Sequence, residues 1–340
     1  MALSMRSRQT LRLAFAASAV ALALGADPAL AQPRHAEAGS ALIFPLFDSR
    51  EGMGTIITVT NTNVSRRRCS GDFLEGDVSI RYTYFGLEDP ERECVEFNRH
   101  ELLTPGDTLT VVAEQHNPEG VIGWLWVEAE DPETGDPIDF DYLIGSAIVV
   151  DKGTSLSFGY TPYSFQGMTE GDGEETPCGH RVTDLDNDGR ADFNGREYDY
   201  FPLYLHLDNF FEEGGNPNFA SELTLLSLRF FGQTTLSFLI YNNREDQFSR
   251  GMRIDCFYRD SLRNVSGVVT NLDGDPTELQ FPGMRQAESG WLRVTGDAPI
   301  LGVFAQKIEG SSFVQGRELQ FSGQFGGPND TRHSPAELPR

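Results

Sequence analysis

The sequence predicts an all-β fold of two tandem β-sandwich domains that arose by internal duplication. Gly123 to Val150 begins with GWLWV and Gly290 to Ile308 begins with GWLRV, and both continue through an acidic turn, a proline, an isoleucine and a glycine. Thr55 to Asn61 (TIITVTN) is similar to Leu236 to Asn242 (LSFLIYN). Because both pairs occur in the same order along the chain, they indicate one repeated β unit.

The residue pattern between these motifs is typical of strands. From Ala41 to Phe165 and from Ser221 to Phe325, β-branched and aromatic residues alternate with polar ones, and Gly, Pro, Asn and Asp interrupt the runs. Helical periodicity is almost absent. Each repeat has the size of one immunoglobulin-like sandwich, so we expect two tandem immunoglobulin-like domains, over residues 41–165 and 200–325.

The first 31 residues have the pattern of a secretory signal peptide. A basic start precedes an apolar stretch from Leu13 to Leu24, and Ala29 and Ala31 form an A-x-A cleavage site. No later segment approaches the roughly 20 apolar residues of a transmembrane helix. We therefore expect an exported protein that is extracellular, on the cell surface or periplasmic, with no transmembrane anchor.

The chain is strongly acidic. Its formal net charge is -24, and removal of the signal leaves 24 basic and 50 acidic residues, a net charge of -26. A surface of this sign repels nucleic acid and anionic lipid, so the predicted partners are proteins or glycans and not nucleic acid.

Four cysteines in an exported chain predict disulfides, because the close CxxC spacings of a zinc site are missing. Three pairings are possible. We expect Cys69 with Cys94, which bracket a strand-rich segment of the first repeat, and Cys178 with Cys256.

Two segments lack a sandwich pattern. Residues 166–199 form an acidic, glycine-rich connection, and the aromatic run from Tyr198 to Phe211 that follows is expected to pack against the second domain. Residues 326–340 carry no apolar pattern and are predicted to be a disordered tail.

Aligning the repeats predicts which side chains face the core. Leu125 and Val127 correspond to Leu292 and Val294 and should point inward. The inward phases of a second strand pair are predicted to be Val78, Ile80, Tyr82 and Tyr84 in the first repeat and Met252, Ile254, Cys256 and Tyr258 in the second.

Three tryptophans mark the same strands. Trp124 and Trp291 occupy equivalent positions and are expected to have the same structural role. Trp126 lies on the face that carries Arg293 in the second copy. Two interpretations of this position are possible. The ring is either exposed and available to a glycan or protein, or covered by the domain interface or a neighbouring loop.

The clearest chemical signal is DLDNDGRAD, residues 184–192. Asp184, Asp186 and Asp188 with the carbonyl of Arg190 place oxygen ligands at alternate positions, and Asp192 adds a fourth carboxylate. Hard cations such as calcium prefer such oxygen ligands on a short loop with a glycine at the turn. The sequence therefore predicts a calcium site of roughly 0.1 to 1 mM affinity.

This loop resembles the DxDxDG loops of EF-hands, dockerins and thrombospondin type 3 repeats over about a dozen residues. It departs from the EF-hand at the twelfth position, where Gly195 replaces the bidentate glutamate, so Glu197 or Asp199 would have to complete the ligand set. The alternative is an acidic turn without an ion, since Asp and Asn favour turns by bonding their own backbone.

Catalytic signatures are weak. None of the six histidines adjoins a serine or cysteine in a nucleophile motif such as GxSxG. The signal, the segment LTPGDTLTV (Leu103 to Val111) and the GWLxV strands resemble bacterial exported proteins with tandem immunoglobulin-like domains, mostly of unassigned function. That resemblance implies a surface or extracellular interaction role.

These observations together predict a non-enzymatic structural, adhesive or interaction protein stabilised by calcium. The alternative is a carbohydrate-binding protein that uses Trp126, and a secreted hydrolase comes third.

Overall fold

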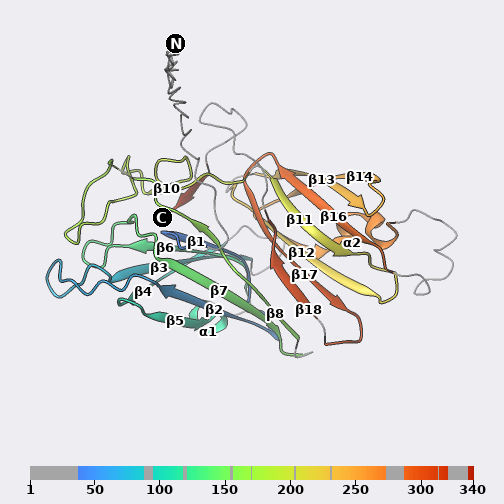
Figure 1. Ribbon diagram of the computed structural model, residues 1–340, viewed down its shortest axis with the longest axis horizontal. Coiled ribbons are helices and arrows are strands. Elements are labelled where there is room, and N and C mark those ends of the chain that lie inside the picture. Colours follow the sequence, from blue (N-terminus) through green and yellow to red (C-terminus); the bar gives the residue numbers. More distant parts are fainter. Residues whose placement is uncertain are drawn as a thin grey trace, which may run out of the picture.

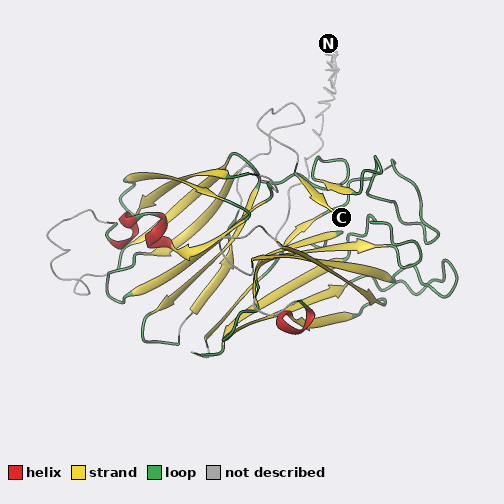
Figure 2. Ribbon diagram, turned by 180° about the vertical axis from the view of Figure 1, so that it is seen from behind, coloured by secondary structure: helices red, strands yellow, loops and turns green. Residues whose placement is uncertain are grey.

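A computed structural model describes residues 37–87, 95–117, 121–153, 156–169, 171–202, 204–229, 232–272, 287–312, 314–320 and 336–340. Nearly all its regular structure is antiparallel strand, arranged as two β-sandwiches side by side (Figures 1 and 2). The predicted signal peptide and Cys94 lie outside the described residues. Across the described ranges, no helix is long and apolar enough to cross a membrane.

The first sandwich contains nine strands. One sheet has the order β4-β3-β6-β1-β9 and the other has the order β5-β2-β7-β8. The elements are β1 (Ala41–Asp48), β2 (Met53–Asn61), β3 (Val78–Leu87), β4 (Val95–Leu103), β5 (Thr108–Val112), α1 (Ala113–His116), β6 (Ile122–Glu130), β7 (Leu143–Asp151), β8 (Leu156–Tyr160) and β9 (Tyr163–Phe165).

The second sandwich contains eight strands in the orders β11-β16-β13-β14 and β15-β12-β17-β18. Its elements are β11 (Tyr204–Phe211), β12 (Phe219–Ser227), β13 (Thr234–Asn242), β14 (Gln247–Ile254), β15 (Phe257–Ser261), α2 (Leu262–Val265), the 3₁₀ turn η1 (Gly267–Thr270), β16 (Ser289–Gly296), β17 (Ile300–Ile308) and β18 (Val314–Glu318).

The strand orders support the internal duplication. Strands β1 to β8 have the same neighbours as β11 to β18, so each of these eight strands has a topological equivalent numbered ten higher, and β9 is an additional edge strand of the first sandwich. The prediction of an all-β fold with two tandem sandwiches is confirmed. Both units are antiparallel β-sandwiches, and the first two strands of each lie in opposite sheets, whereas an immunoglobulin domain has them in the same sheet.

Register confirms the equivalence of the two GW strands. Gly123 of β6 lies opposite Phe47, and Gly290 of β16 lies opposite Phe210. The next pair inward, after an irregularity in both copies, joins Leu125 to Phe44 and Leu292 to Leu207. Leu125, Val127, Leu292 and Val294 are all buried, as the alternation predicted.

The other predicted strand pairs are wrong. Thr55–Asn61 belongs to β2, whose equivalent is β12, whereas Leu236–Asn242 belongs to β13, the equivalent of β3. Tyr84 lies opposite Leu125 and Ile240 lies opposite Leu292, so Tyr84 is equivalent to Ile240 and not to Cys256. Short alternating runs look alike in every strand, so such runs alone cannot identify equivalent strands.

Each sandwich has its own apolar core, and a third cluster joins them. The third cluster contains outward-facing residues of the first sandwich, residues of the connection and residues of β12 and β17, and it comprises Ala41, Ile43, Phe85, Trp124, Trp126, Tyr163, Phe165, Ala191, Phe193, Tyr198, Phe201, Leu226, Leu228, Leu301, Ala336 and Leu338. We call this set the junction cluster. Because these residues are buried, the two sandwiches meet at a packed interface.

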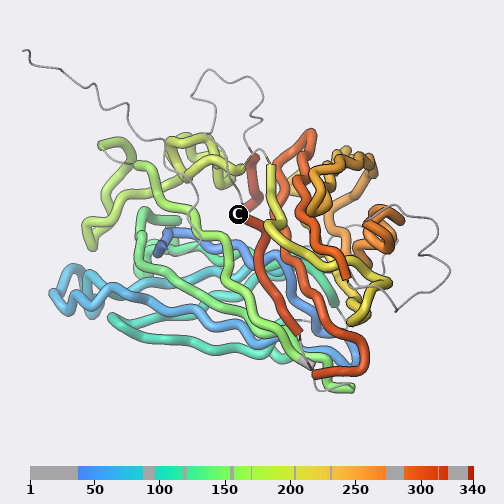
Figure 3. The backbone as a smooth tube through the Cα atoms, turned by 45° about the vertical axis from the view of Figure 1, so that its right-hand side comes forward, coloured from blue at the N-terminus to red at the C-terminus, as the bar shows by residue number. Residues whose placement is uncertain are grey.

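Polar contacts reinforce this interface. The buried hydroxyl of Tyr163 in β9 donates to the carbonyl oxygens of Gly302 in β17 and Leu319, at 2.8 and 2.6 Å. Arg259 of β15 forms an ion pair with the fully buried Asp48 of β1. Strands β8 and β18 also lie side by side along the lower edge of the molecule (Figure 3).

The aromatic run from Tyr198 to Phe211 divides between two places. Tyr198 and Phe201 belong to the junction cluster, and Tyr204 begins β11 at the edge of a sheet of the second sandwich. The expectation that this run packs against the second domain therefore holds for its strand half, while its first residues pack between the sandwiches.

Replacing Tyr163 by Phe should lower the unfolding free energy by about 1 to 3 kcal/mol, because two buried carbonyl oxygens lose a donor. Thermal unfolding of the full chain measures the loss. Tyr241→Phe is the matched control, since that hydroxyl donates to Gln247 at an exposed position. Equal effects of the two changes would show that the Tyr163 hydroxyl contributes nothing special to the interface.

Candidate functional site

The acidic loop lies in the connection between the sandwiches and brings three of its predicted ligands together. One carboxylate oxygen from each of Asp184, Asp186 and Asp188 lies within 4.8 Å of the others. Asn187 and Gly189 have φ values of 57° and 72°, the left-handed conformation that lets the chain turn this sharply.

Backbone amides shape the loop. The amide of Gly189 donates to Asp184 Oδ2 at 3.1 Å, and that of Arg190 donates to Asp188 Oδ1 at 2.8 Å. Asp184 Oδ1 is shielded from solvent and has no hydrogen-bond partner among the described residues. A shielded carboxylate oxygen without a donor is suited to a cation, so the residues present fit calcium.

Asp192 and Arg190 lie at the end of the loop, in β10 (Arg190–Asp192). The carboxylate of Asp192 accepts a hydrogen bond from Asn194 and is not one of the three that meet. Burial, with the nearby charges of Glu337, Asp186 and Asp188, raises the pKa of Asp192. Arg190 uses its side chain in an ion pair with Glu337 at 2.6 Å.

Glu197 stabilises the acidic loop by accepting hydrogen bonds from its backbone. Its two carboxylate oxygens accept the amides of Leu185 and Asp192 at 2.8 and 3.0 Å, which ties the two ends of the loop together. Burial raises the pKa of Glu197 to about 7. Asp199, the other residue considered for the ligand set, accepts the amide of Gln166 instead.

The last five residues dock on this loop. β19 (Glu337–Pro339) pairs with β10, and Leu338 is buried in the junction cluster with 1% of its surface exposed. The prediction of a disordered tail is therefore wrong for residues 336–340, while residues 321–335 lie outside the described ranges. The two apolar residues Ala336 and Leu338 are too few to form a recognisable sequence pattern. In the structure they pack into the junction cluster, which other segments build.

Arg340 acts as an internal cation beside the loop. Its guanidinium lies 3.1 Å from Asp184 Oδ2, 3.1 Å from Glu128 Oε1 and 3.6 Å from Glu197 Oε2. Glu128 is fully buried, so the pairing offsets the cost of keeping its charge out of water. Composition could not reveal this contact, because Arg340 and Glu128 are 212 residues apart.

Trp126 is not an exposed ligand contact. Its ring is 3% exposed and packs against the edges of Phe193 and Tyr198, with ring centroids 5.2 and 6.1 Å apart. The interpretation that the ring is available to a glycan is wrong, and the covered alternative holds. Phe193 and Tyr198 of the connection cover the ring. The residue pattern of one strand cannot predict a contact with a distant segment.

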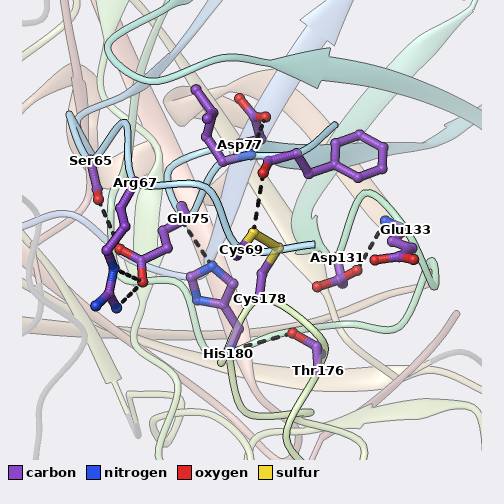
Figure 4. Close-up of a disulfide and its surroundings, with 12 residues drawn as sticks. Ser65, Arg67, Cys69, Glu75, Asp77, Asp131, Glu133, Thr176, Cys178 and His180 are labelled. Atoms are coloured by element: carbon purple, nitrogen blue, oxygen red, sulfur yellow. Dashed lines mark hydrogen bonds and ion pairs between the residues drawn. A yellow bond between two sulfur atoms is a disulfide. The ribbon is translucent and has the colours of Figure 1, made fainter. Parts of the chain in front are cut away.

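The expected cysteine pairing is also wrong. Cys69 is bonded to Cys178, which links the loop between β2 and β3 to the connection (Figure 4). Cys256 is disulfide-bonded as well. Next to the first bond, His180 Nε2 lies 3.0 Å from the carbonyl oxygen of Glu75 (Figure 4). Proximity in the fold decided the pairing, since disulfides need Cα atoms about 4.4 to 6.8 Å apart.

A cleft of about 720 Å³ opens where the interface between the sandwiches ends. Residues of both sandwiches line it, with β12, β15 and β17 contributing from the second. Apolar and aromatic lining comes from Phe158, Phe257 and Tyr258, and charged lining comes from Arg50, Asp151, Glu222, Arg259, Asp260 and Lys307. The sequence analysis missed these residues, because they come from strands far apart in the chain.

An ion network fixes one wall of the cleft. Asp48 accepts hydrogen bonds from the guanidinium of Arg50 at 2.9 and 2.7 Å, and it also pairs with Arg259. The charges of Arg50 and Arg259 and the hydrogen bonds from Arg50 outweigh burial, so the pKa of Asp48 lies below its usual range. Arg259 bridges onward to Glu222. The cleft wall therefore holds ionised side chains in defined positions.

Asp141, in the segment between β6 and β7, is a further carboxyl with an altered pKa, and it contacts the start of the connection. It accepts hydrogen bonds from Ser40 Oγ at 2.7 Å and from the amide of Gly167 at 2.9 Å. Burial, with the charge of Asp139 nearby, raises the pKa of Asp141 to about 7.

Comparison with known proteins assigns no family. No family model matches the chain, and no curated protein matches it. Among solved structures, the crystal structure of Thermotoga maritima 1070 is similar at 4% identity and a TM-score of 0.27, over 36% of this chain and 96% of that chain. A likeness this weak indicates no shared role, and the resemblance to bacterial exported tandem-domain proteins stays a prediction.

Replacing Cys69 and Cys178 by serine should strongly lower the melting temperature. The bond joins residues 109 positions apart, and a loop of about 100 residues is worth roughly 4.7 kcal/mol in the chain-entropy model. Peptide mapping without reductant should recover a Cys69–Cys178 link. Recovery of Cys69 bonded to Cys94 would contradict the structure.

Asp141→Asn should remove part of the pH dependence of stability. The folded carboxyl keeps its proton to about pH 7, whereas an unfolded Asp loses it near 3.8, so its contribution is present at low pH and is lost as pH rises towards 7. We expect the variant to melt at a higher temperature than wild type at pH 8 and to differ less at pH 5. The exposed Asp136→Asn is the control, and an identical pH profile for Asp141→Asn and wild type would refute the assignment.

Proposed function

We propose that this is an exported, non-enzymatic structural or adhesive interaction protein whose connection between the sandwiches binds calcium. The observation that carries the proposal is the meeting of Asp184, Asp186 and Asp188 within 4.8 Å on a sharply turned loop. Bound calcium supplies positive charge to carboxylates that otherwise repel each other.

The position of the loop explains why calcium would matter to the whole molecule. The loop continues into β10, which pairs with the C-terminal strand β19, and Asp184 contacts Arg340. Phe193, directly after β10, belongs to the junction cluster. An ordered loop therefore stabilises the tail and the packing between the sandwiches, so calcium would act as a structural ion.

Disulfide bonding supports an extracellular, cell-surface or periplasmic location. Cys69, Cys178 and Cys256 are all disulfide-bonded, and such bonds persist mainly in oxidising compartments. An interaction role is consistent with the packed interface, because Tyr163 and the Arg259–Asp48 pair hold the two sandwiches as one rigid display surface.

The alternative function is carbohydrate binding, which the cleft between the sandwiches favours. Its volume and its aromatic residues Phe158, Phe257 and Tyr258 suit a small saccharide better than the buried Trp126 does. A glycan array run with wild type and Phe257→Ala distinguishes the two. Binding that disappears in the variant would favour the alternative, and no binding would favour a structural or protein-interaction role.

Calcium should raise the melting temperature of wild type but not of the double variant Asp184→Asn with Asp188→Asn. A ligand that binds only the folded state stabilises it by about 1.4 kcal/mol at ten times its dissociation constant. Calorimetry in millimolar calcium measures the shift, with magnesium at equal ionic strength as a second control.

A matched acidic control distinguishes site binding from screening of the net charge. Asp136→Asn with Glu133→Gln removes two carboxylates from an exposed turn and should leave the calcium response intact. If calcium raises the melting temperature of all variants equally, screening explains the effect and the loop is an acidic turn.

A further inference from the structure

The duplication gives each sandwich an equivalent sheet face, and the described residues cover only one of the two. On β16 and β13, Trp291 stacks on Tyr241 with ring centroids 4.2 Å apart and planes 5° apart. On β6 and β3, Trp124 stacks on Phe85 at the same 4.2 Å distance. Both pairs are direct cross-strand neighbours, so the same aromatic pair is built twice.

In the first sandwich this pair is buried in the junction cluster. Trp124 is 0% exposed, and Phe193 and Tyr198 of the connection lie over its neighbour Trp126. In the second sandwich Trp291 is 36% exposed. The expectation that Trp124 and Trp291 have the same structural role is therefore wrong, although their positions are equivalent.

The outer face of the β11-β16-β13-β14 sheet has a distinctive composition. Its outward positions alternate with the core residues of these strands, and they are Tyr204, His206, Asp208, Ser289, Trp291, Arg293, Thr295, Thr235, Ser237, Leu239, Tyr241, Gln247, Ser249, Gly251 and Arg253. We call this set the aromatic face. Asp208 is the one acidic residue of this set, although the chain carries 51 acidic residues, and it forms an ion pair with Arg317 at 2.8 Å.

Polar atoms on the aromatic face lack partners. Nε of Arg293 and Nε2 of His206 are shielded from solvent and make no hydrogen bond within the described residues. The guanidinium of Arg293 lies over the ring of Tyr204, 5.6 Å from its centroid. Burial and the charge of Arg293 lower the pKa of His206. A partner that brings hydrogen-bonding oxygens would satisfy these groups.

The occupied face of the first sandwich indicates the chemistry of a partner. The covering stretch, residues 184–199, contains six acidic residues and two arginines, with aromatic side chains among them. Its Tyr198 hydroxyl donates to Glu128 on β6, and Arg340 of the tail pairs with the same Glu128. In the second sandwich the strand position equivalent to Trp126 is Arg293, so a matching cover would bring a carboxylate.

We infer that the aromatic face binds an acidic polypeptide segment that carries an aromatic side chain, with Arg293 as the charge partner and the edges of Trp291 and Tyr241 as the apolar contact. A sugar ring fits less well, because Trp291 lies between the parallel rings of Tyr241 and His206 and its faces are already occupied. The inference deepens the proposed interaction function and does not depend on calcium.

Selection from a phage library of random peptides of about 12 residues, long enough to cross four strands when extended, tests this directly. The full chain is the bait, and Arg293→Glu serves for counter-selection. Enriched peptides should combine Asp or Glu with Trp, Tyr or Phe. An absence of enrichment, or enrichment of basic peptides, overturns the inference.

Synthetic peptides from the selection then supply the affinity test. Binding followed by fluorescence polarisation should weaken about tenfold or more, roughly 1.4 kcal/mol, for Arg293→Glu and for Trp291→Ala. Arg66→Glu, an exposed charge reversal in the first sandwich, should bind like wild type. Arg293→Gln removes the charge without reversing it and should also weaken binding. This variant keeps the test valid if Arg293→Glu misfolds.

Two further measurements distinguish an acidic partner from a calcium effect and from self-association. Affinity should fall as salt is raised and should be the same in calcium and in chelator, so failure of the calcium proposal leaves this test intact. Sedimentation of wild type alone should show a monomer. A concentration-dependent dimer that Arg293→Glu abolishes would assign the face to a second copy and overturn the acidic partner.

Discussion

Packing of the connection over the outer face of the first sandwich is the constraint on which the rest of the structure depends. Phe193 and Tyr198 cover Trp126, and β17 closes the cluster from the second sandwich through Leu301. Burying apolar surface is favourable by about 25 cal/mol for each square ångström, so this cover stabilises the packing between the sandwiches. This contact places the sandwiches, the acidic loop and the tail relative to one another.

The charges of the molecule are organised around the same contact. Glu128 is on the covered face, and Arg340 reaches it from the tail while also contacting Asp184 of the acidic loop. A buried carboxylate, a buried guanidinium and Asp184 of the candidate ion site thus form one network, in which the pair of Glu128 and Arg340 is shielded from screening by salt. Loss of any one of these groups would destabilise the interface between the sandwiches. The aromatic face of the second sandwich lies outside this network.

Duplication was recognisable from the sequence only where the motif was long and distinctive. GWLWV and GWLRV identified β6 and β16 correctly, and the register around Gly123 and Gly290 agrees to the residue. The shorter runs in β2 and β13 were matched wrongly, since five to seven alternating residues describe any strand with one buried face. Side-chain phase was correct in β3, where Val78, Ile80, Tyr82 and Tyr84 are buried, because alternation depends only on which face meets the core, but it was wrong for Cys256, which follows β14 and packs against the junction cluster.

The sequence by itself determined the all-β class, the repeated unit, the core positions of the GW strands and the grouping of Asp184, Asp186 and Asp188. Each follows from neighbours a few residues apart, whose spacing the backbone geometry sets. Only the tertiary structure decided the Cys69–Cys178 bond, the burial of Trp126 and the docking of the tail. These depend on segments about 50 to 200 residues apart, and their pairing is chosen by the free energy of packing in three dimensions and not by local pattern.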